Sequence, residues 1–259
     1  MNIVIAGYGF VGQAVHEALD RHSKVQLYID DPAKDLDEAD GLNQVDAVVV
    51  CVATPPNEDG SCDINNVIDV FEKYGGGSVK YLIKSAVDPV FLKAFDQAGD
   101  YNITYSPEFL RGSHAHGKPT DEFLNQTFAI YGGDDCRWWD ELFKAVLPNL
   151  EEVRYLTLEQ AAFSKYLENT FLATKVTFFN EMYQIYNLLG FQGFDAMVEA
   201  ITLDKRIGKS HTQVPGPDGK FGFGGHCLPK DLDALRSLVN ADRTPLLDTV
   251  VDINHEIRK

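Results

Sequence analysis

The sequence is poor in cysteine and in positive charge, and both shortages exclude classes of protein. Its 259 residues include four cysteines and no CxxC pair, so we expect neither a disulfide scaffold nor a zinc site, and we assign no metal ligand. Lysine and arginine number 23 against 39 aspartates and glutamates, which gives a formal net charge of -16. An acidic surface repels nucleic-acid phosphates and anionic lipids, so neither is expected as a partner.

Long apolar runs are also missing. No run approaches the roughly 20 residues that cross a bilayer. The chain enters MNIVIAGYG directly, without a basic region or a cleavage site, so we expect a cytoplasmic protein. A hydrophobic content of 44% with 24% charged residues is ordinary for one large globular domain or two modest ones.

The N-terminal stretch NIVIAGYGFVGQAVHEAL predicts a strand, a glycine turn and a helix. Gly7 permits the turn, Gly9 lets the backbone approach a pyrophosphate, and Gly12 lets the helix pack closely on the strand. Phe10 and Val11 complete the motif at the helix start, where phosphates bind, and we assign them to the same cofactor site.

A carboxylate follows at the distance that dinucleotide binding requires. The next expected strand, VQLYID, ends at Asp30, about 18 residues after Gly12, where a carboxylate accepts hydrogen bonds from the adenosine ribose. Such a carboxylate favours NAD over NADP, whose 2′-phosphate it repels. The alternative is a sheet of the same kind with an empty site.

Four more apolar runs are spaced as strands with helices between them, which predicts an α/β fold with a Rossmann-type doubly wound parallel sheet. They are DAVVVCVA (46–53), VKYLIKSA (79–86), YNITYS (101–106) and QTFAIYGG (126–133). Thr54, Ser85 and Glu108 lie at or just after the carboxyl ends of these runs, where ligands bind in such sheets. The alternative for Ser, Thr and Pro at these positions is turn chemistry alone.

The second half predicts an all-helical domain with one long central helix. Residues 158–189 carry no proline or glycine and keep apolar spacings of three and four before Gly190, so we place domains at 1–155 and 156–259. Lys165 and Asn169 are four residues apart on this helix and share one face. That face either points to the cofactor or is simply solvated.

The stretch FGFGGHCLPKD (221–231) holds one cysteine at the start of a predicted helix. Pro229 suits a first helical turn, so Cys227 lies at or just before the helix N-terminus. The positive helix end and a nearby lysine favour the reactive thiolate, while the glycines let backbone amides approach a ligand. An ordinary glycine turn with an inert cysteine is the alternative. The other three cysteines are expected to be structural.

Six ordered motifs together resemble the UDP-glucose/GDP-mannose dehydrogenase family, which oxidises the C6 alcohol of a nucleotide sugar to a carboxylate with two NAD. They are GYGFVG (7–12), ATP (53–55), SPEFLRG (106–112), FSKYLENTFLATKVTFFNEM (163–182), DKRIG (204–208) and GFGGHCLPKD (222–231). The last two look closer to the UDP-glucose branch, so UDP-glucose is the leading substrate.

The resemblance implies a role for each matching residue. Cys227 would add to the aldehyde formed by the first oxidation, and a thiohemiacetal and a thioester would follow. Lys165 and Asn169 would bind the sugar hydroxyl and stabilise developing oxyanion charge, while Asp231 would orient or activate water. The remaining implied residues contact the sugar or NAD: Glu108, Arg206 and Gly224 for the sugar, and Thr54, Ser85 and Lys230 for NAD.

The chain also departs from the family pattern. Ala86 stands where members usually carry Thr, and Gly112 stands where they carry a second Glu, with His114 as a possible substitute group. The resemblance also implies a C-terminal nucleotide-binding domain that these 259 residues do not contain, so we expect a minimal form, a piece of a longer protein, or another chain that supplies the missing half. A homodimer through the central helix is expected.

Two other functions remain open. A chain without the donor domain could bind NAD or a partner without turnover. A 3-hydroxyacid or 6-phosphogluconate type of dehydrogenase also joins a Rossmann domain to a helix with Lys and Asn, but needs no cysteine, so SPEFLR and the cysteine stretch count against it.

Overall fold

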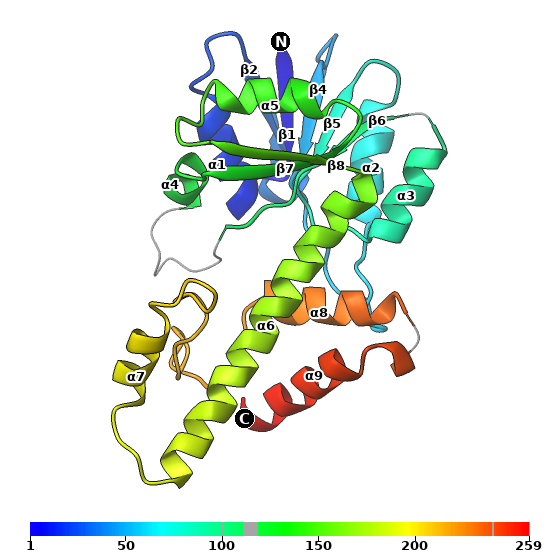
Figure 1. Ribbon diagram of the computed structural model, residues 1–259. Helices are drawn as coiled ribbons and strands as arrows, with labels where there is room; N and C mark the ends of the chain where they lie inside the picture. Colours follow the sequence, from blue (N-terminus) through cyan, green and yellow to red (C-terminus); the bar gives the residue numbers. More distant parts are fainter. Residues whose placement is uncertain (100, 111–118, 240, 259) are drawn as a thin grey trace. The chain divides into compact units, whose positions relative to one another are not determined.

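The computed structural model describes residues 1–99, 101–110, 119–239 and 241–258 (Figure 1). It divides into two compact units, Met1–Lys165 and Tyr166–Lys259. The boundary expected after residue 155 lies just ahead of helix α6 (Leu158–Leu188), whereas the division lies inside this helix. The reason is packing, because Leu158, Ala161 and Ala162 from the first turns of α6 are buried in a core of the first unit.

The first unit contains an eight-stranded sheet in the order β3-β2-β1-β4-β5-β6-β7-β8. Strands β2, β1, β4, β5 and β6 run parallel to one another, as do β7 and β8. The strands are β1 (Asn2–Ala6), β2 (Gln26–Asp31), β3 (Leu36–Asp37), β4 (Ala47–Val50), β5 (Lys80–Ile83), β6 (Asn102–Tyr105), β7 (Phe128–Gly133) and β8 (Glu152–Leu156).

The sheet is mixed, not fully parallel, because β7 is antiparallel to β6. This pairing brings Gly132 opposite Tyr105, and a Cβ at Gly133 would lie 2.1 Å from the backbone oxygen of Ile103. The run 126–133 is therefore a strand, as expected, but in the opposite direction. Strands β3 and β8 were not anticipated from the sequence.

Helices cover both faces of this sheet, as expected for a doubly wound fold (Figure 1). They are α1 (Phe10–Leu19), α2 (Asn65–Tyr74), α3 (Pro89–Gln97), α4 (Pro119–Leu124) and α5 (Cys136–Lys144), with a short 3₁₀ helix η1 (Pro32–Lys34). Strand β1 shows why two cores form. Ile3 and Ile5 lie in one buried cluster, while Val4 and Ala6 lie in another, because successive side chains alternate between faces.

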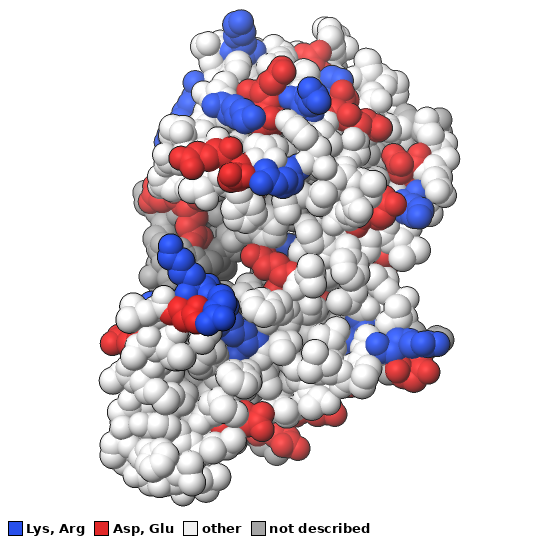
Figure 2. Space-filling model, viewed as in Figure 1, with Lys and Arg blue, Asp and Glu red and all other residues white. Residues whose placement is uncertain are grey.

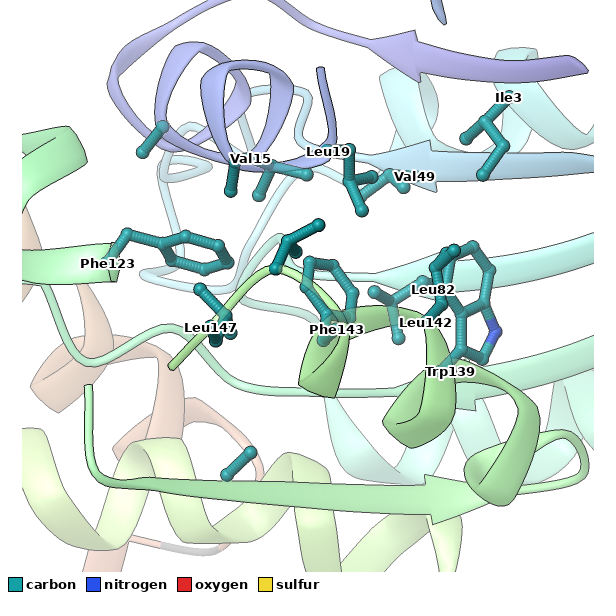
Figure 3. Close-up of a cluster of buried hydrophobic side chains, with 14 of the residues drawn as sticks. Ile3, Val15, Leu19, Val49, Leu82, Phe123, Trp139, Leu142, Phe143 and Leu147 are labelled. Carbon is teal, nitrogen blue, oxygen red and sulfur yellow. The ribbon is translucent and has the colours of Figure 1, made fainter. Parts of the chain in front are cut away.

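Figure 3 shows the core on the α1 and α5 side of the sheet. Val15 and Leu19 of α1 meet Val49 and Leu82 of the sheet, and α5 adds aromatic bulk through Trp139. This core fixes α1, and hence the glycine turn in front of it, against the strands.

The second unit is helical within its described residues. Besides the rest of α6 it contains α7 (Phe194–Ile201), α8 (Cys227–Ser237) and α9 (Pro245–Ile257), and a 3₁₀ helix η3 (Ala241–Arg243). Phe223 and Leu232 pack with α6 and α9 in one cluster, and Phe179 and Phe194 pack in another. The long helix ends at Leu188, one residue before the expected end, and Gly190 follows with a φ of 75°.

Charges of both signs are intermixed on the face shown in Figure 2. None of the described helices is long and apolar enough to cross a membrane. The cytoplasmic location stays a prediction.

Candidate active site

The glycine turn between β1 and α1 has two closed positions and one open position. A Cβ at Gly7 would lie 2.7 Å from the Cys51 backbone oxygen, and one at Gly12 would lie 2.0 Å from the Gly7 oxygen. A Cβ at Gly9, the N-cap of α1, would meet nothing within 4 Å. The fold itself therefore requires Gly7 and Gly12, while the backbone at Gly9 is open to a ligand.

Asp30 is engaged by α2. Its carboxylate is 4% exposed, and it accepts hydrogen bonds from Lys73 Nζ at 3.0 Å and from the Tyr74 hydroxyl at 2.5 Å. Burial and this hydrogen bond raise the pKa of Tyr74 well above its ordinary value, so the phenol stays a donor. Each oxygen of Asp30 already has a protein partner.

Asp31, the next residue, lies at the glycine turn. Its Oδ2 accepts a hydrogen bond from the Tyr8 backbone N–H at 2.8 Å, and Lys34 Nζ donates to the Tyr8 backbone oxygen at 2.5 Å. The sequence interpretation missed Asp31, although alternation along a strand places neighbouring residues on opposite faces. Two adjacent acids at a strand end were the available signal.

Thr54 and Ser85 tie together the loops that follow β4 and β5. The Thr54 hydroxyl donates to the Ala86 backbone oxygen at 2.8 Å, and the Ser85 hydroxyl donates to the Val52 backbone oxygen at 2.7 Å. Ala86 thus takes part through its backbone. Their assignment to cofactor binding stays a prediction.

Glu108 pairs with Lys84, a residue that the sequence interpretation did not single out. Lys84 Nζ lies 3.2 Å from Glu108 Oε2 and 3.4 Å from the Ser106 hydroxyl, while the Phe109 N–H donates to Glu108 Oε1 at 2.9 Å. Both side chains of the pair are buried. Gly112 and His114 lie outside the described residues.

Lys165 and Asn169 lie one turn apart on α6. Lys165, the last residue of the first unit, is half-buried and places its ammonium 5.3 Å from the centre of the Phe109 ring. Asn169, in the second unit, is 3% exposed, so the alternative of a solvated side is wrong for this residue.

Cys227 is the first residue of α8, as expected, and it is exposed. Asp231, one turn later, is buried, and it accepts hydrogen bonds from Asn169 Nδ2 at 2.5 Å and from Lys230 Nζ at 2.6 Å. The second unit therefore brings Asn169 of α6 together with Lys230 and Asp231 near the start of α8, the helix that carries the cysteine.

Arg206 and Gly224, which the sequence predicted as sugar contacts, contact other residues of the protein. Arg206 is 90% exposed and pairs with Asp204 at 2.5 Å. A Cβ at Gly224 would lie 1.9 Å from Arg258 Nη2, so this glycine makes room for a side chain of its own unit. No group of acidic, histidine or cysteine side chains suited to a metal ion occurs among the described residues.

Comparisons with known proteins show a family match and several relatives. Residues 159–256 match the central domain of the UDP-glucose/GDP-mannose dehydrogenase family. The UDP-glucose 6-dehydrogenase of Rickettsia bellii is 32% identical over 83% of this chain and 50% of its own length, and that of Pseudomonas aeruginosa is 32% identical over 76% and 45%. The chain thus spans about half the length of the curated relatives that it matches.

A solved structure extends the similarity over nearly the whole chain. The UDP-glucose dehydrogenase from the archaeon Pyrobaculum islandicum superposes with a TM-score of 0.76 and 25% identity, covering 98% of this chain and 68% of that one. The sequence motifs, the doubly wound sheet, the long helix and these relatives lead to one conclusion: the chain belongs to the UDP-glucose/GDP-mannose dehydrogenase family.

Proposed function

We propose that the protein oxidises a nucleotide sugar, with UDP-glucose as the leading candidate, at C6 to the uronate with NAD. One observation carries the proposal. Cys227 is exposed at the first residue of α8, and Asp231, one turn later on the same helix, lies in a buried network with Asn169 and Lys230. A cysteine at a helix N-terminus is in a setting that favours a nucleophilic thiolate.

The reaction gives each of these side chains a task. Lys165 and Asn169 bind the C6 hydroxyl and stabilise the negative charge that develops on its oxygen. The thiolate of Cys227 adds to the aldehyde carbon, and the thiohemiacetal loses a hydride to become a thioester. Asp231 orients the water that attacks the thioester, which releases the carboxylate and returns the thiol. Glu108 contacts the sugar and assists proton transfer.

NAD, when bound, accepts one hydride in each oxidation. The residues at the glycine turn fit it: the backbone at Gly9 is open, and the N-terminus of α1 lacks a side-chain cap. The carboxylate of Asp31 lies beside Tyr8 in the same turn, in a position suited to ribose hydroxyls. Asp31 therefore joins Asp30 as a candidate for the ribose carboxylate.

A turnover assay tests the proposal. Purified protein is mixed with NAD and a panel of UDP- and GDP-sugars, NADH is followed, and Cys227→Ser is assayed in parallel. We expect two NADH per sugar for the wild type and no uronate for the variant. Thermal stabilisation by NAD without turnover on any sugar would favour a cofactor-binding homologue, or one that needs a second chain for the nucleotide of the sugar.

We also propose a homodimer through α6. Apolar side chains on this helix repeat at spacings close to four and seven and stay 44–86% exposed in the single chain, which is the pattern of a helix–helix seam. They are Leu167, Phe171, Phe178, Ile185 and Leu188. Sedimentation should give a dimer for the wild type and a monomer for Phe171→Glu. Val90→Glu, at an exposed apolar position of α3, should stay dimeric.

A further inference from the structure

Two buried asparagines hold the backbone just ahead of Cys227. Asn180, on α6, accepts a hydrogen bond from the Gly222 N–H at 2.9 Å through its Oδ1. Asn254, on α9, accepts from the Phe223 N–H at 2.8 Å and donates to the Phe223 oxygen at 3.1 Å. The two asparagines are 1% and 7% exposed. One Asn254 side chain thus satisfies both polar groups of the Phe223 backbone.

The glycines of this loop are explained by the same contacts. A Cβ at Gly222, where φ is 72°, would lie 2.3 Å from Asn254 Oδ1. Arg258 donates to the backbone oxygens of Phe221 and Gly222 at 3.1 and 3.3 Å, and a Cβ at Gly224 would collide with its guanidinium. Glycine at positions 222 and 224 therefore leaves room for the side chains of Asn254 and Arg258, which hold the loop in place.

The buried side-chain amides of Asn180 and Asn254 favour this loop conformation, because their hydrogen bonds to the Gly222–Phe223 backbone form only when the loop has it. A buried amide without partners is costly, so any displacement of the Gly222–Phe223 backbone that breaks these bonds is opposed. Asn180 completes its own pairing by donating to the Val176 oxygen at 2.8 Å. Phe223 itself is buried in the cluster that joins α8 and α9.

Cys227 lies between two such anchors. Phe223 precedes it in the loop ahead of α8 and is held by Asn254. Asp231 follows it by one turn and is held by Asn169 and Lys230. The second anchor belongs to the proposed catalytic residues, whereas Asn254 is not among the residues assigned to the substrate or the cofactor.

We propose that Asn254, acting with Asn180 on the Gly222–Phe223 backbone, is a positioning residue that holds Cys227 at the N-terminus of α8. The proposal rests on the proposed function only in taking Cys227 as the nucleophile. It predicts that loss of the asparagine lowers the reactivity of the thiol, although the thiol stays exposed, because the backbone ahead of α8 is released and the first helical turn, which contains Cys227, is no longer held in place.

The test is the rate at which iodoacetamide labels Cys227, resolved by peptide mass spectrometry, in the full chain. For Asn254→Ala we expect labelling slower than in the wild type by more than about threefold, the loss of a helix-end effect on a thiolate. A labelling rate within about threefold of the wild-type rate, or a faster one, would overturn the proposal. If Asn254→Ala does not fold, Asn180→Ala, which removes one loop contact in place of two, is measured against the same criterion.

Thr177→Val is the matched control. Thr177 is also buried on α6, but its hydroxyl donates only to the Ala173 oxygen of its own helix at 3.0 Å. It should lower the melting temperature without slowing the labelling of Cys227, and equal slowing in both variants would show a general loss of structure and overturn the positioning role. Labelling needs no turnover, so an inactive wild type would count against the proposed function and leave this test intact.

Where the wild type oxidises a sugar, a second measurement separates positioning from binding. We expect kcat of Asn254→Ala to fall by about tenfold or more while KM stays within about threefold, because misplacing a reactive group costs rate at the chemical step. A raised KM with unchanged kcat would contradict the positioning role. Asn180→Ala combined with Asn254→Ala should lose less than the product of the single losses, since both act on one backbone segment.

Discussion

Lys84 and Glu108 form an ion pair of 3.2 Å, with 4% and 7% of their side chains exposed. The lysine ammonium also lies 5.3 and 5.7 Å from the ring centres of Phe123 and Phe143. The pair joins the ends of β5 and β6 at the carboxyl edge of the sheet. It is a buried charge pair at the edge where ligands bind in such folds.

Removing one charge of this pair should be costly. Lys84→Met leaves the buried carboxylate of Glu108 without its cation, so the free energy of unfolding should fall by about 3–5 kcal/mol. Urea denaturation measures it. The double variant Lys84→Met with Glu108→Gln should recover part of the loss, because no charge then remains unpaired.

The control for this prediction is a surface pair. Lys93 and Glu159 lie 3.8 Å apart with 57% and 41% exposure. Lys93→Met should change the free energy of unfolding by less than about 1 kcal/mol. If the two lysine variants lower the free energy of unfolding equally, the buried Lys84–Glu108 pair contributes no more to stability than a surface pair, and the prediction is wrong.

Gly12 and Gly9 should separate the structural from the ligand-binding part of the glycine turn. Gly12→Ala places a methyl 2.0 Å from the Gly7 oxygen and should cost about 1–3 kcal/mol or more of unfolding free energy. The methyl of Gly9→Ala meets no protein atom within 4 Å, so the only cost is that alanine is a poorer N-cap than glycine. The free energy of unfolding should fall by about 1 kcal/mol or less. Its methyl would stand where the pyrophosphate is proposed to bind. Thermal stabilisation by NAD should therefore be lost in Gly9→Ala, and its full retention would contradict the site.

Asp30 and Asp31 should respond oppositely to the same substitution. Asp30→Asn removes the charge that Lys73 and Tyr74 share, so it should lower the free energy of unfolding by about 1–3 kcal/mol. Asp31→Asn should change stability little but weaken NAD binding about tenfold or more, since a charged acceptor is lost to the ribose. Urea denaturation measures the stability of each variant, and titration calorimetry measures its affinity for NAD.

Asp35→Asn is the control for net charge, because Asp35 has a φ of 54°, which asparagine tolerates. It should bind NAD like the wild type. If Asp30→Asn loses NAD binding and Asp31→Asn keeps it, Asp30 is the ribose carboxylate, as the sequence predicted.

The sequence predicted those parts of the fold that local patterns determine. The short β-branched run of β1, the glycine turn, and the long proline-free stretch of α6 each give a signal within one segment. Strand β8 gave no such signal, because most of its residues are exposed at the sheet edge. The direction of β7 depends on its pairing with β6, which no local pattern encodes.

The site shows the same limit. Cys227 could be placed from Pro229 and the helical spacing that follows it. The partners of Asp231 and of Phe223 could not be found in this way, because Asn169 and Asn254 are 62 and 31 residues away in the chain. Nor could the sequence show that Asp30 turns towards α2, since this depends on which face of β2 the lysine and tyrosine of α2 cover.

Three of the cysteines should differ in how fast they are labelled at pH 8. Burial raises the pKa of the Cys51 thiol to about 12 and that of Cys136 to about 11, and the Cys136 thiol also donates to the Gly133 oxygen at 3.3 Å. At pH 8 both should therefore resist iodoacetamide in the folded protein, whereas Cys227 is exposed and should be labelled. Labelling of Cys51 as fast as that of Cys227 would contradict the raised pKa of the Cys51 thiol.

The same shifts predict a loss of stability in alkali. A thiol whose pKa is raised on folding keeps its proton longer in the native state, so its contribution is complete below the ordinary value of 9.0 and is lost as pH rises towards about 12 for Cys51. Between pH 9 and 11 the free energy of unfolding should fall more steeply for the wild type than for Cys51→Ala, which lacks this group. Urea denaturation at several pH values measures the two slopes. Parallel slopes would show that Cys51 ionises as easily in the folded chain as in the unfolded one.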